Sequence, residues 1–329
     1  MSEIQSSYPF ASARVMALES KLITNEKLTR LIEARDFETA MRQLVEFGYG
    51  QSASDFETMI QKELSETDAL LAELSPSDVF TRIVRAGRDY ANLKVIIKLL
   101  MRGLALDSVP LVSGNINVET LRRAISENNY VDLPDHIKKA LGYIDRQFAI
   151  AADPSVIGVA LDRAYAKEIR DLTAQMNNEL VTTYFTVYFD LSNIIAMLRV
   201  RASGASKDTF DRAFLKGGRI EKRTLLNAFD LPDENVLSAA GRGGYAAILA
   251  DAYEDYLKTG SLYMLEKKRD DYLLSLLKKH RYDMFGIGPL FGYYIAKQRE
   301  AAGVRMVMTA KQGGIDADVV TKRLKELYM

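Results

Sequence analysis

Residues 89–98 read DYANLKVIIK, and residues 190–199 read DLSNIIAMLR. Both stretches fit one pattern, in which Asp and Asn are separated by two residues and are followed by an aliphatic residue, an apolar pair and a basic residue. The two copies start roughly 100 residues apart, and a looser third copy starts near Gly286, with Pro289 at the Asn position. The chain therefore contains a weak internal repeat of helical units.

A second signature alternates with the first: Gly-x-Ile with an aliphatic residue five positions after the Ile. Its copies are Gly114/Ile116/Leu121, Gly218/Ile220/Leu225 and Gly313/Ile315/Val320, with a degenerate copy at Ile23/Leu28. No long helix follows the last copy, and the N-terminal helix, residues 11–21, could take that place. We therefore expect the two termini to lie close together, in a three-part body around a pseudo-threefold axis. An open, solenoid-like arc is the competing geometry.

The periodicity of apolar residues is helical throughout, which predicts an all-α protein. The repeat divides the chain into three expected units, residues 1–112, 113–216 and 217–329, with the C-terminal helix near the N-terminal helix. We expect one long helical element over 156–203, bent near Thr182, and a terminal helix over 316–328. Residues 304–309 alternate like a short strand, but a helix extension is favoured because no second strand is available to pair with them.

Composition excludes several functions. The chain has 329 residues, 44 basic and 44 acidic, which argues against an overall basic nucleic-acid binder. Cysteine is absent, so thiolate chemistry is excluded, and His136 and His280 lie too far apart in sequence for a histidine-rich metal site. No Walker A motif is present. Residues 1–7 lack the features of a signal peptide, and no apolar run approaches the ~20 residues that span a bilayer, so membrane association should be peripheral.

Several groups of residues invite a chemical interpretation. Asp89 with Asn92, and Asp190 with Asn193, each share a helix face, so they could bind a metal or make packing hydrogen bonds; packing is favoured. The glycine-rich stretch 241–244 could bind an anion, but an exposed loop is favoured. The Lys-Thr-Gly sequence at 258–260 and the Ser-x-x-Lys match at Ser275 and Lys278 are attributed to chance. The apolar stretch 285–291 could be a packed corner or a partner contact, and the corner is favoured.

Five stretches together resemble the C subunit of the archaeal and bacterial V/A-type rotary ATPases (ATP synthases), the relative of the eukaryotic d subunit. They are YPFASARVMALESKL at 8–22, DYANLK at 89–94, LDRAY at 161–165 with DLSNI at 190–194, and FGIGPL at 285–290 followed by Ala296, Lys297 and Glu300. The matches span nearly the whole chain in the order of that family. Gly288 departs from the pattern, because an acidic residue is expected before the Pro-Leu pair.

The resemblance implies a funnel-shaped, three-part helical protein on the cytoplasmic side of the membrane. Such a protein sits between the central axle subunits of the ATPase head and the membrane proteolipid ring. It transmits torque, has no active site or cofactor, and binds neither nucleic acid nor a small-molecule substrate. A detachable rotor joint should be polar, because both of its faces meet water after separation. The candidate docking residues are Arg82, Arg85, Arg88, Arg199 and Arg201.

Two other functions remain open from the residues. One is a helical-repeat scaffold or adaptor. Termini that lie far apart and binding along a concave face would favour this function. The other is a helical enzyme with a site made of Asp89, Asn92, Asp190 and Asn193, which a bound metal would favour.

Overall fold

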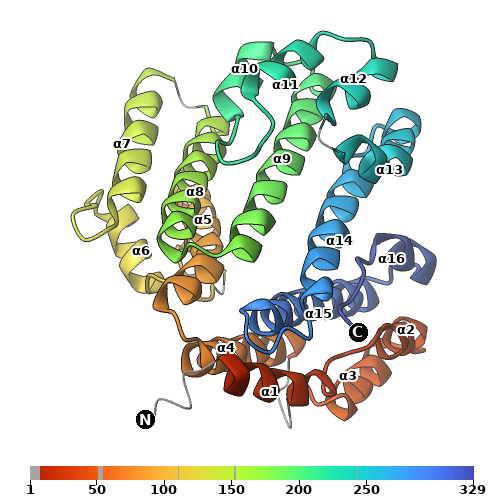
Figure 1. Cartoon of the computed structure of the whole chain (residues 1–329). Helices are drawn as coiled ribbons and strands as arrows, with labels where there is room; N and C mark the ends of the chain where they lie inside the picture. The colour runs from red at the N-terminus through yellow and green to blue at the C-terminus, as the bar shows by residue number, and fades with distance from the viewer. Residues whose placement is uncertain (1–7, 51–54, 110, 152, 243) are drawn as a thin grey trace. The chain divides into compact units, whose positions relative to one another are not determined.

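The computed structural model describes residues 8–50, 55–109, 111–151, 153–242 and 244–329. Within these ranges the chain forms sixteen α-helices and no strand, which confirms the all-α prediction (Figure 1). The first eight helices are α1 Tyr8–Glu19, α2 Asn25–Glu33, α3 Phe37–Glu46, α4 Phe56–Leu74, α5 Asp78–Met101, α6 Val118–Ser126, α7 Asp135–Ile150 and α8 Ser155–Met176. The others are α9 Glu179–Ala202, α10 Lys207–Ala213, α11 Lys222–Phe229, α12 Asp233–Ala240, α13 Tyr245–Thr259, α14 Tyr263–Lys279, α15 Gly288–Gln312 and α16 Ala317–Arg323.

The chain divides into two compact units. Unit 1 combines Met1–Asp78 with Asp270–Met329, and unit 2 is Val79–Arg269. Unit 1 therefore brings the N-terminal and C-terminal parts of the chain into one body. The three expected units of residues 1–112, 113–216 and 217–329, and their arrangement about an axis, stay predictions.

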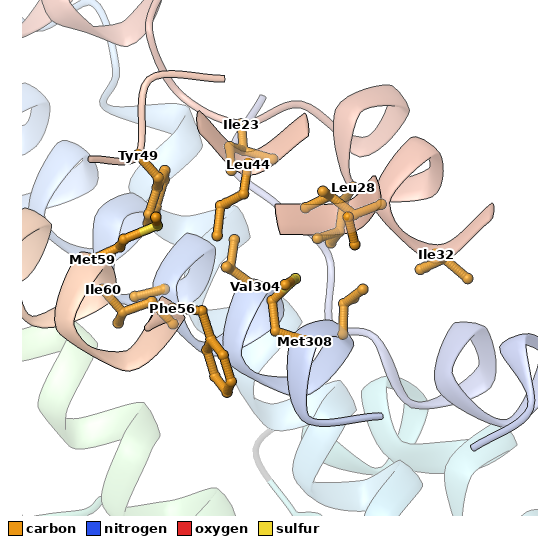
Figure 2. Close-up of a cluster of buried hydrophobic side chains, with 14 of the residues drawn as sticks. Ile23, Leu28, Ile32, Leu44, Tyr49, Phe56, Met59, Ile60, Val304 and Met308 are labelled. Atoms are coloured by element: carbon orange, nitrogen blue, oxygen red, sulfur yellow. The ribbon is translucent and has the colours of Figure 1, made fainter. Parts of the chain in front are cut away.

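Unit 1 is built around helix α15, which contacts α1, α2, α3 and α4. Figure 2 shows side chains of the N-terminal helices gathered against Val304 and Met308 of α15. Leu31 and Leu44 are completely buried in this cluster. Full burial of such a side chain contributes ~1.5–3 kcal/mol, so this cluster contributes substantially to the stability of unit 1.

A buried polar network crosses the same core. Glu300 of α15 accepts hydrogen bonds from the backbone N–H of Ile23 (2.5 Å) and from the Tyr49 hydroxyl (2.6 Å). The Lys297 ammonium donates to Glu300 (2.6 Å) and to Glu63 of α4 (2.8 Å). Burial lowers the pKa of Lys297, but the Glu300 and Glu63 carboxylates outweigh that effect and the net pKa is raised. The lysine therefore stays charged and joins α15 to α4.

The C-terminal segment also binds within unit 1. The Asn25 side chain donates to the backbone oxygen of Met329 at 3.5 Å, and α16 contacts α2. The residues after α16 are not helical, so the expected terminal helix over 316–328 is wrong beyond Arg323. Side chains of unit 1 bind the backbone of that segment instead. The Glu326 N–H donates to Asp271 (3.0 Å), and the Glu326 carbonyl accepts from Arg299.

Unit 2 has its own apolar core, in which α7 and α8 pack closely together. Leu93 of α5, Leu121 of α6 and Leu161 of α8 are completely buried in it. The expected single element over 156–203 is wrong, because α8 ends at Met176 and the next residue, Asn177, has a left-handed backbone (φ 49°). Asn178 then caps α9 by accepting from the Val181 N–H at 3.1 Å.

The alternating stretch 304–309 lies in the middle of α15, as the favoured prediction of a helix extension states. Val304, Val307 and Met308 are buried, whereas Arg305 pairs with Glu57 of α4 at 2.6 Å. The face of α15 that packs on α4 carries Arg305 between apolar residues, and Arg305 donates two hydrogen bonds to Glu57. This arrangement produces the apparent alternation in the sequence.

We expect Lys297→Met to destabilise unit 1 by about 3–5 kcal/mol, because it leaves buried carboxylates without their cation. Lys62→Met is the matched control, since Lys62 pairs with Glu66 at 3.8 Å on the exposed face of α4. An exposed pair contributes about 0–1 kcal/mol. Urea unfolding followed by circular dichroism measures both. Equal losses in the two variants would show that the buried network does not stabilise the unit.

Candidate functional site

The Asp-x-x-Asn pair on α5 holds the loop that precedes α6. The Asp89 carboxylate accepts hydrogen bonds from the backbone N–H groups of Asn115 (2.9 Å) and Ile116 (3.1 Å). The Asn92 side chain donates to the Val112 carbonyl at 2.9 Å. Asp89 and Asn92 are both buried. The pair therefore fastens the start of a short helix to the long helix, an arrangement that we call a carboxylate clamp.

The second copy forms the same clamp on α9. Asp190 accepts from the N–H groups of Arg219 (3.0 Å) and Ile220 (2.8 Å), and from the Tyr245 hydroxyl (2.9 Å). Asn193 exchanges two hydrogen bonds of 2.8 Å with the backbone of Leu215. Ile116 and Ile220, the isoleucines of the Gly-x-Ile signature, thus occupy equivalent positions. The two signatures found in the sequence are two halves of one structural joint.

The glycines of the first two Gly-x-Ile copies, Gly114 and Gly218, permit this contact. A Cβ atom at Gly114 would lie 2.7 Å from Cγ of Asp89, and one at Gly218 would lie 2.7 Å from Cγ of Asp190. Real Cβ atoms essentially never approach other heavy atoms that closely. Only glycine lets the loop backbone reach the carboxylate, which explains the spacing of the signature.

A third carboxylate clamp forms in unit 1 between segments at opposite ends of the chain. Glu300 of α15 accepts from the N–H of Ile23, the first residue of the degenerate Ile23/Leu28 copy. Leu28, five positions later, is buried. The carboxylate comes from Glu300 rather than from the Gly286 position of the looser third copy. Ile315, by contrast, is largely exposed, so the Gly313 copy does not share this buried joint.

The two aspartate pairs are thus occupied by backbone groups, as the packing interpretation predicts. Within the described residues, no group of three or more His, Asp or Glu side chains is placed to hold a metal ion. Among the other sequence matches, Ser275 donates to the Tyr272 carbonyl in its own helix at 2.7 Å. Position 243, in the glycine-rich stretch 241–244, lies outside the described residues.

Burial raises the pKa of Asp89 to about 6, even though the N–H groups of Ile116 and Asn115 favour the ionised form. The neighbouring Glu168 carboxylate contributes in the same direction. Burial also raises the pKa of Glu168, but hydrogen bonds from His136 and Tyr90 outweigh it, so the net pKa lies below its ordinary value. Tyr90 donates to Glu168 at 2.7 Å. Glu168 escaped prediction from the sequence, since nothing local marks a glutamate on α8 as buried.

Three of the predicted docking arginines lie on α5. Arg82 is exposed, and its backbone carbonyl accepts from the Asn115 side chain at 2.8 Å. Arg85 and Arg88 are half-buried and have partners within the protein. Arg82 is thus the member of this group whose side chain is best placed to reach a partner.

The other two predicted docking arginines lie in the last turn of α9. Arg199 is exposed and bonds to Glu266. Arg201 is mostly buried, donates to Asp233 at 2.6 Å and to the Phe229 carbonyl, and stacks over the Phe229 ring. Arg201 therefore ties α9 to α11 and α12, while its role in docking stays a prediction.

The apolar stretch 285–291 is mostly buried, with one exposed aromatic side chain. Ile287, Leu290 and Phe291 are buried, so most of it is the packed corner that the sequence favours. Phe285 instead has 81% of its surface exposed, next to the exposed Tyr282. The corner therefore also presents two aromatic rings to solvent.

By length and composition alone, one described helix qualifies as a membrane-spanning candidate. Helix α9 has 24 residues, its mean hydropathy is 1.2, and 61% of the apolar window is buried within the protein. It also carries the buried Asp190 and Asn193 of the second clamp. These contacts describe a core helix of unit 2.

Comparison with known proteins places this fold in a family. The model of the ATP synthase (C/AC39) subunit family matches residues 11–323, so the chain belongs to that family. The C subunit of the A-type ATP synthase of Methanocaldococcus jannaschii is 25% identical, over 92% of this chain and 82% of that protein. The C subunit of the V-type sodium ATPase of Enterococcus hirae is 26% identical, over 83% of each. The C subunit of the A-type ATP synthase of Thermococcus gammatolerans is 22% identical, over 97% of this chain and 90% of that protein. The resemblance to the C subunit of V/A-type ATPases is confirmed.

We expect Gly218→Ala to destabilise unit 2 by about 1–3 kcal/mol, because the added methyl group overlaps Asp190. Gly158→Ala is the control, since its Cβ would meet nothing within 4 Å on α8. Alanine there should be neutral or should stabilise the helix by about 0.5–1 kcal/mol. Thermal unfolding measures both, and faster hydrogen exchange at the Ile220 amide should accompany only the first. Unchanged exchange at Ile220 in Gly218→Ala would contradict the clamp.

The pKa of Asp89 can be measured directly. Because this pKa is about 6 in the folded protein, against an ordinary value of 3.8, the folded state holds the proton more tightly. The contribution of Asp89 to stability is therefore greatest below pH 4 and is lost as pH rises through 6, by on the order of 3 kcal/mol. Carboxyl-carbon NMR should give a midpoint near pH 6 for Asp89.

Asp36 is the internal control for this titration. Hydrogen bonds from the side chain and backbone of Thr39 lower the pKa of Asp36 to about 2. Asp89→Asn and Asp36→Asn assign the two signals. A midpoint below pH 4 for Asp89 would mean that its two backbone hydrogen bonds outweigh burial.

Proposed function

We propose that this chain is a non-catalytic rotor component in the central stalk of a V/A-type ATPase. It couples the axle subunits of the catalytic head to the membrane proteolipid ring, from a peripheral position on the cytoplasmic side. The observation that carries this proposal is the family match over residues 11–323 combined with the carboxylate clamps. Its relatives are the C subunits of A-type ATP synthases and of a V-type sodium ATPase.

A rotor component that transmits torque must resist deformation where its helices meet their connecting loops. Hydrogen bonds to charged groups contribute ~1.5–3 kcal/mol each, and each clamp makes at least one of them to a backbone N–H. A buried carboxylate is also poorly screened by salt. The clamps thus stiffen the joints at which a helical body would otherwise bend.

The proposal includes a funnel of three related sectors. Its support is that the same type of joint occurs three times, at Asp89, Asp190 and Glu300. In the third case the joint uses the first and last parts of the chain, which is what a closed arrangement of repeats requires and an open solenoid does not.

Add-back to membranes tests the rotor function. Membranes of a strain that lacks this chain should retain ATP hydrolysis in the released head but lose ATP-driven ion transport. Adding the purified chain should restore transport and co-sedimentation of the head with the membrane. Normal transport in the absence of the chain would contradict the coupling function.

The docking arginines are tested in the same add-back assay. We expect Arg82→Glu to weaken recovery of the head or the ring about tenfold, because it reverses an exposed charge at a polar joint. Arg102→Glu is the matched control, since Arg102 is exposed just beyond the end of the same helix. Equal recovery with both variants would remove Arg82 from the docking surface.

A further inference from the structure

Unit 2 contains a basic groove of ≈ 670 Å³ that is separate from the carboxylate clamps. Helix α8 contacts both α7 and α10 (Figure 1). The residues that line the groove come mainly from these three helices. Its cationic lining residues are Lys139, Arg163, Lys167, Arg170, Lys216 and Lys222, with His136 at one end. Asp211 is the one carboxylate among the lining residues, and Lys222 already pairs with it at 2.7 Å.

The cations of this groove are exposed and little neutralised. Arg163, Arg170, Lys139 and Lys216 are all exposed, and within the described residues no carboxylate lies within 4.0 Å of their charged atoms. Lys167 pairs with Asp171 at 3.7 Å on the surface. In a chain whose net charge is zero, this concentration of one sign is a local property that attracts anionic ligands.

The hollow of similar size in unit 1 lacks this bias. Its volume is ≈ 730 Å³, and its lining mixes cations with the carboxylates of Glu46, Glu63 and Glu66. Lys297 on its wall is already paired with Glu63 and Glu300. The basic character therefore belongs to the groove of unit 2 and not to hollows of this protein in general.

Apolar side chains line the groove between its cations. Ala140 of α7 and Ala160 and Ala164 of α8 are small and form the buried floor of the groove, whereas the exposed Tyr143 and the half-buried Val159 and Phe214 present the open apolar surface. Small side chains at a contact let another helix approach closely. A phosphate ion or a lipid headgroup would satisfy the cations but would leave this apolar surface uncovered.

The length of the groove also matches a helix. Its lining residues on α8 run from Val159 to Arg170, which corresponds to about 16 Å, or three helical turns. Arg163, Lys167 and Arg170 follow one another at helical spacing on α8, whereas Lys216 lies after α10 and Lys222 is the first residue of α11. A ligand with an apolar face and carboxylates along both sides would meet both sets of cations.

We propose that the groove along α7, α8 and α10 binds an amphipathic, acidic helix of another protein. The apolar face of that helix covers Tyr143, Val159 and Phe214, and its flanking Glu or Asp residues pair with Arg163 and Arg170. This interaction does not depend on the rotor function, since the five docking arginines of that proposal do not line the groove.

Binding of a defined peptide to the full-length chain tests this inference. The probe is a fluorescent helix of about 18 residues, with Leu on one face and Glu on both flanks. A scrambled peptide of the same composition is the control. Fluorescence anisotropy should show binding by the patterned peptide that weakens as salt rises, and binding about tenfold weaker for the scrambled peptide. Equal binding of both peptides, or of neither, would overturn the proposal.

Two double variants locate the binding site. Arg163→Glu with Arg170→Glu should weaken binding of the patterned peptide about tenfold or more. Arg102→Glu with Lys258→Glu reverses two exposed charges elsewhere in unit 2 and should leave binding unchanged. Circular dichroism checks that all variants are folded. An equal loss of peptide affinity in both double variants would show that binding depends only on net charge, and it would contradict a specific binding groove.

A photo-crosslinker at Tyr143 in the native membrane complex identifies the class of the natural occupant. Tyr143 lies in the groove with 37% of its surface exposed. The expected adduct is a protein segment whose sequence is amphipathic and acidic, and it should be lost in the Arg163→Glu/Arg170→Glu variant. A lipid adduct, or a basic segment, would overturn the proposal. The same crosslinker at Tyr282, an exposed tyrosine of unit 1, is the control for nonspecific capture.

Discussion

The hydrogen bond from a backbone N–H to a buried carboxylate on a long helix is the interaction on which the rest of the structure depends. The loops before α6 and α11 have no sheet or helix to satisfy their amides, and buried amides without partners are costly. Asp89 and Asp190 supply the acceptors, and the glycines at 114 and 218 remove the Cβ atoms that would block them. These hydrogen bonds thereby fix the position of each short helix relative to the long helix before it.

The three clamps differ in the hydrogen-bond donors and charged groups that surround the carboxylate. Glu300 has the Lys297 cation and the Tyr49 hydroxyl beside it. Asp190 has the hydroxyl of Tyr245 in addition to two amides. Asp89 accepts from two amides and feels the positive charge of Arg88, but burial outweighs these effects and its pKa is raised, with the nearby Glu168 carboxylate acting in the same direction as burial. One type of joint thus tolerates different neighbours provided that the backbone contact is kept.

Much of this could be predicted from the sequence, because the clamp needs fixed residue types at fixed spacing. The Asp-x-x-Asn and Gly-x-Ile patterns mark both of its halves, and helical periodicity gives the fold class. The third clamp escaped prediction because its acid is Glu300 and its partner, Ile23, is 277 positions away. The end of α8 also escaped, since Asn177 reads as an ordinary polar helix residue until its left-handed backbone is seen. The groove cations come from separate helices, and each alone looks like a solvated surface residue.

The division between buried clamps and exposed cations has a mechanical consequence for a protein that joins others in a complex. Salt at physiological strength screens exposed charges over about 8 Å, whereas it acts weakly on buried hydrogen bonds to carboxylates. Contacts made through Arg82 or through the basic groove should therefore loosen with rising salt well before the joints at Asp89, Asp190 and Glu300 do. In the proposed rotor role, each unit would keep its internal joints while the proposed docking contacts loosen, because the two kinds of interaction differ in their sensitivity to salt.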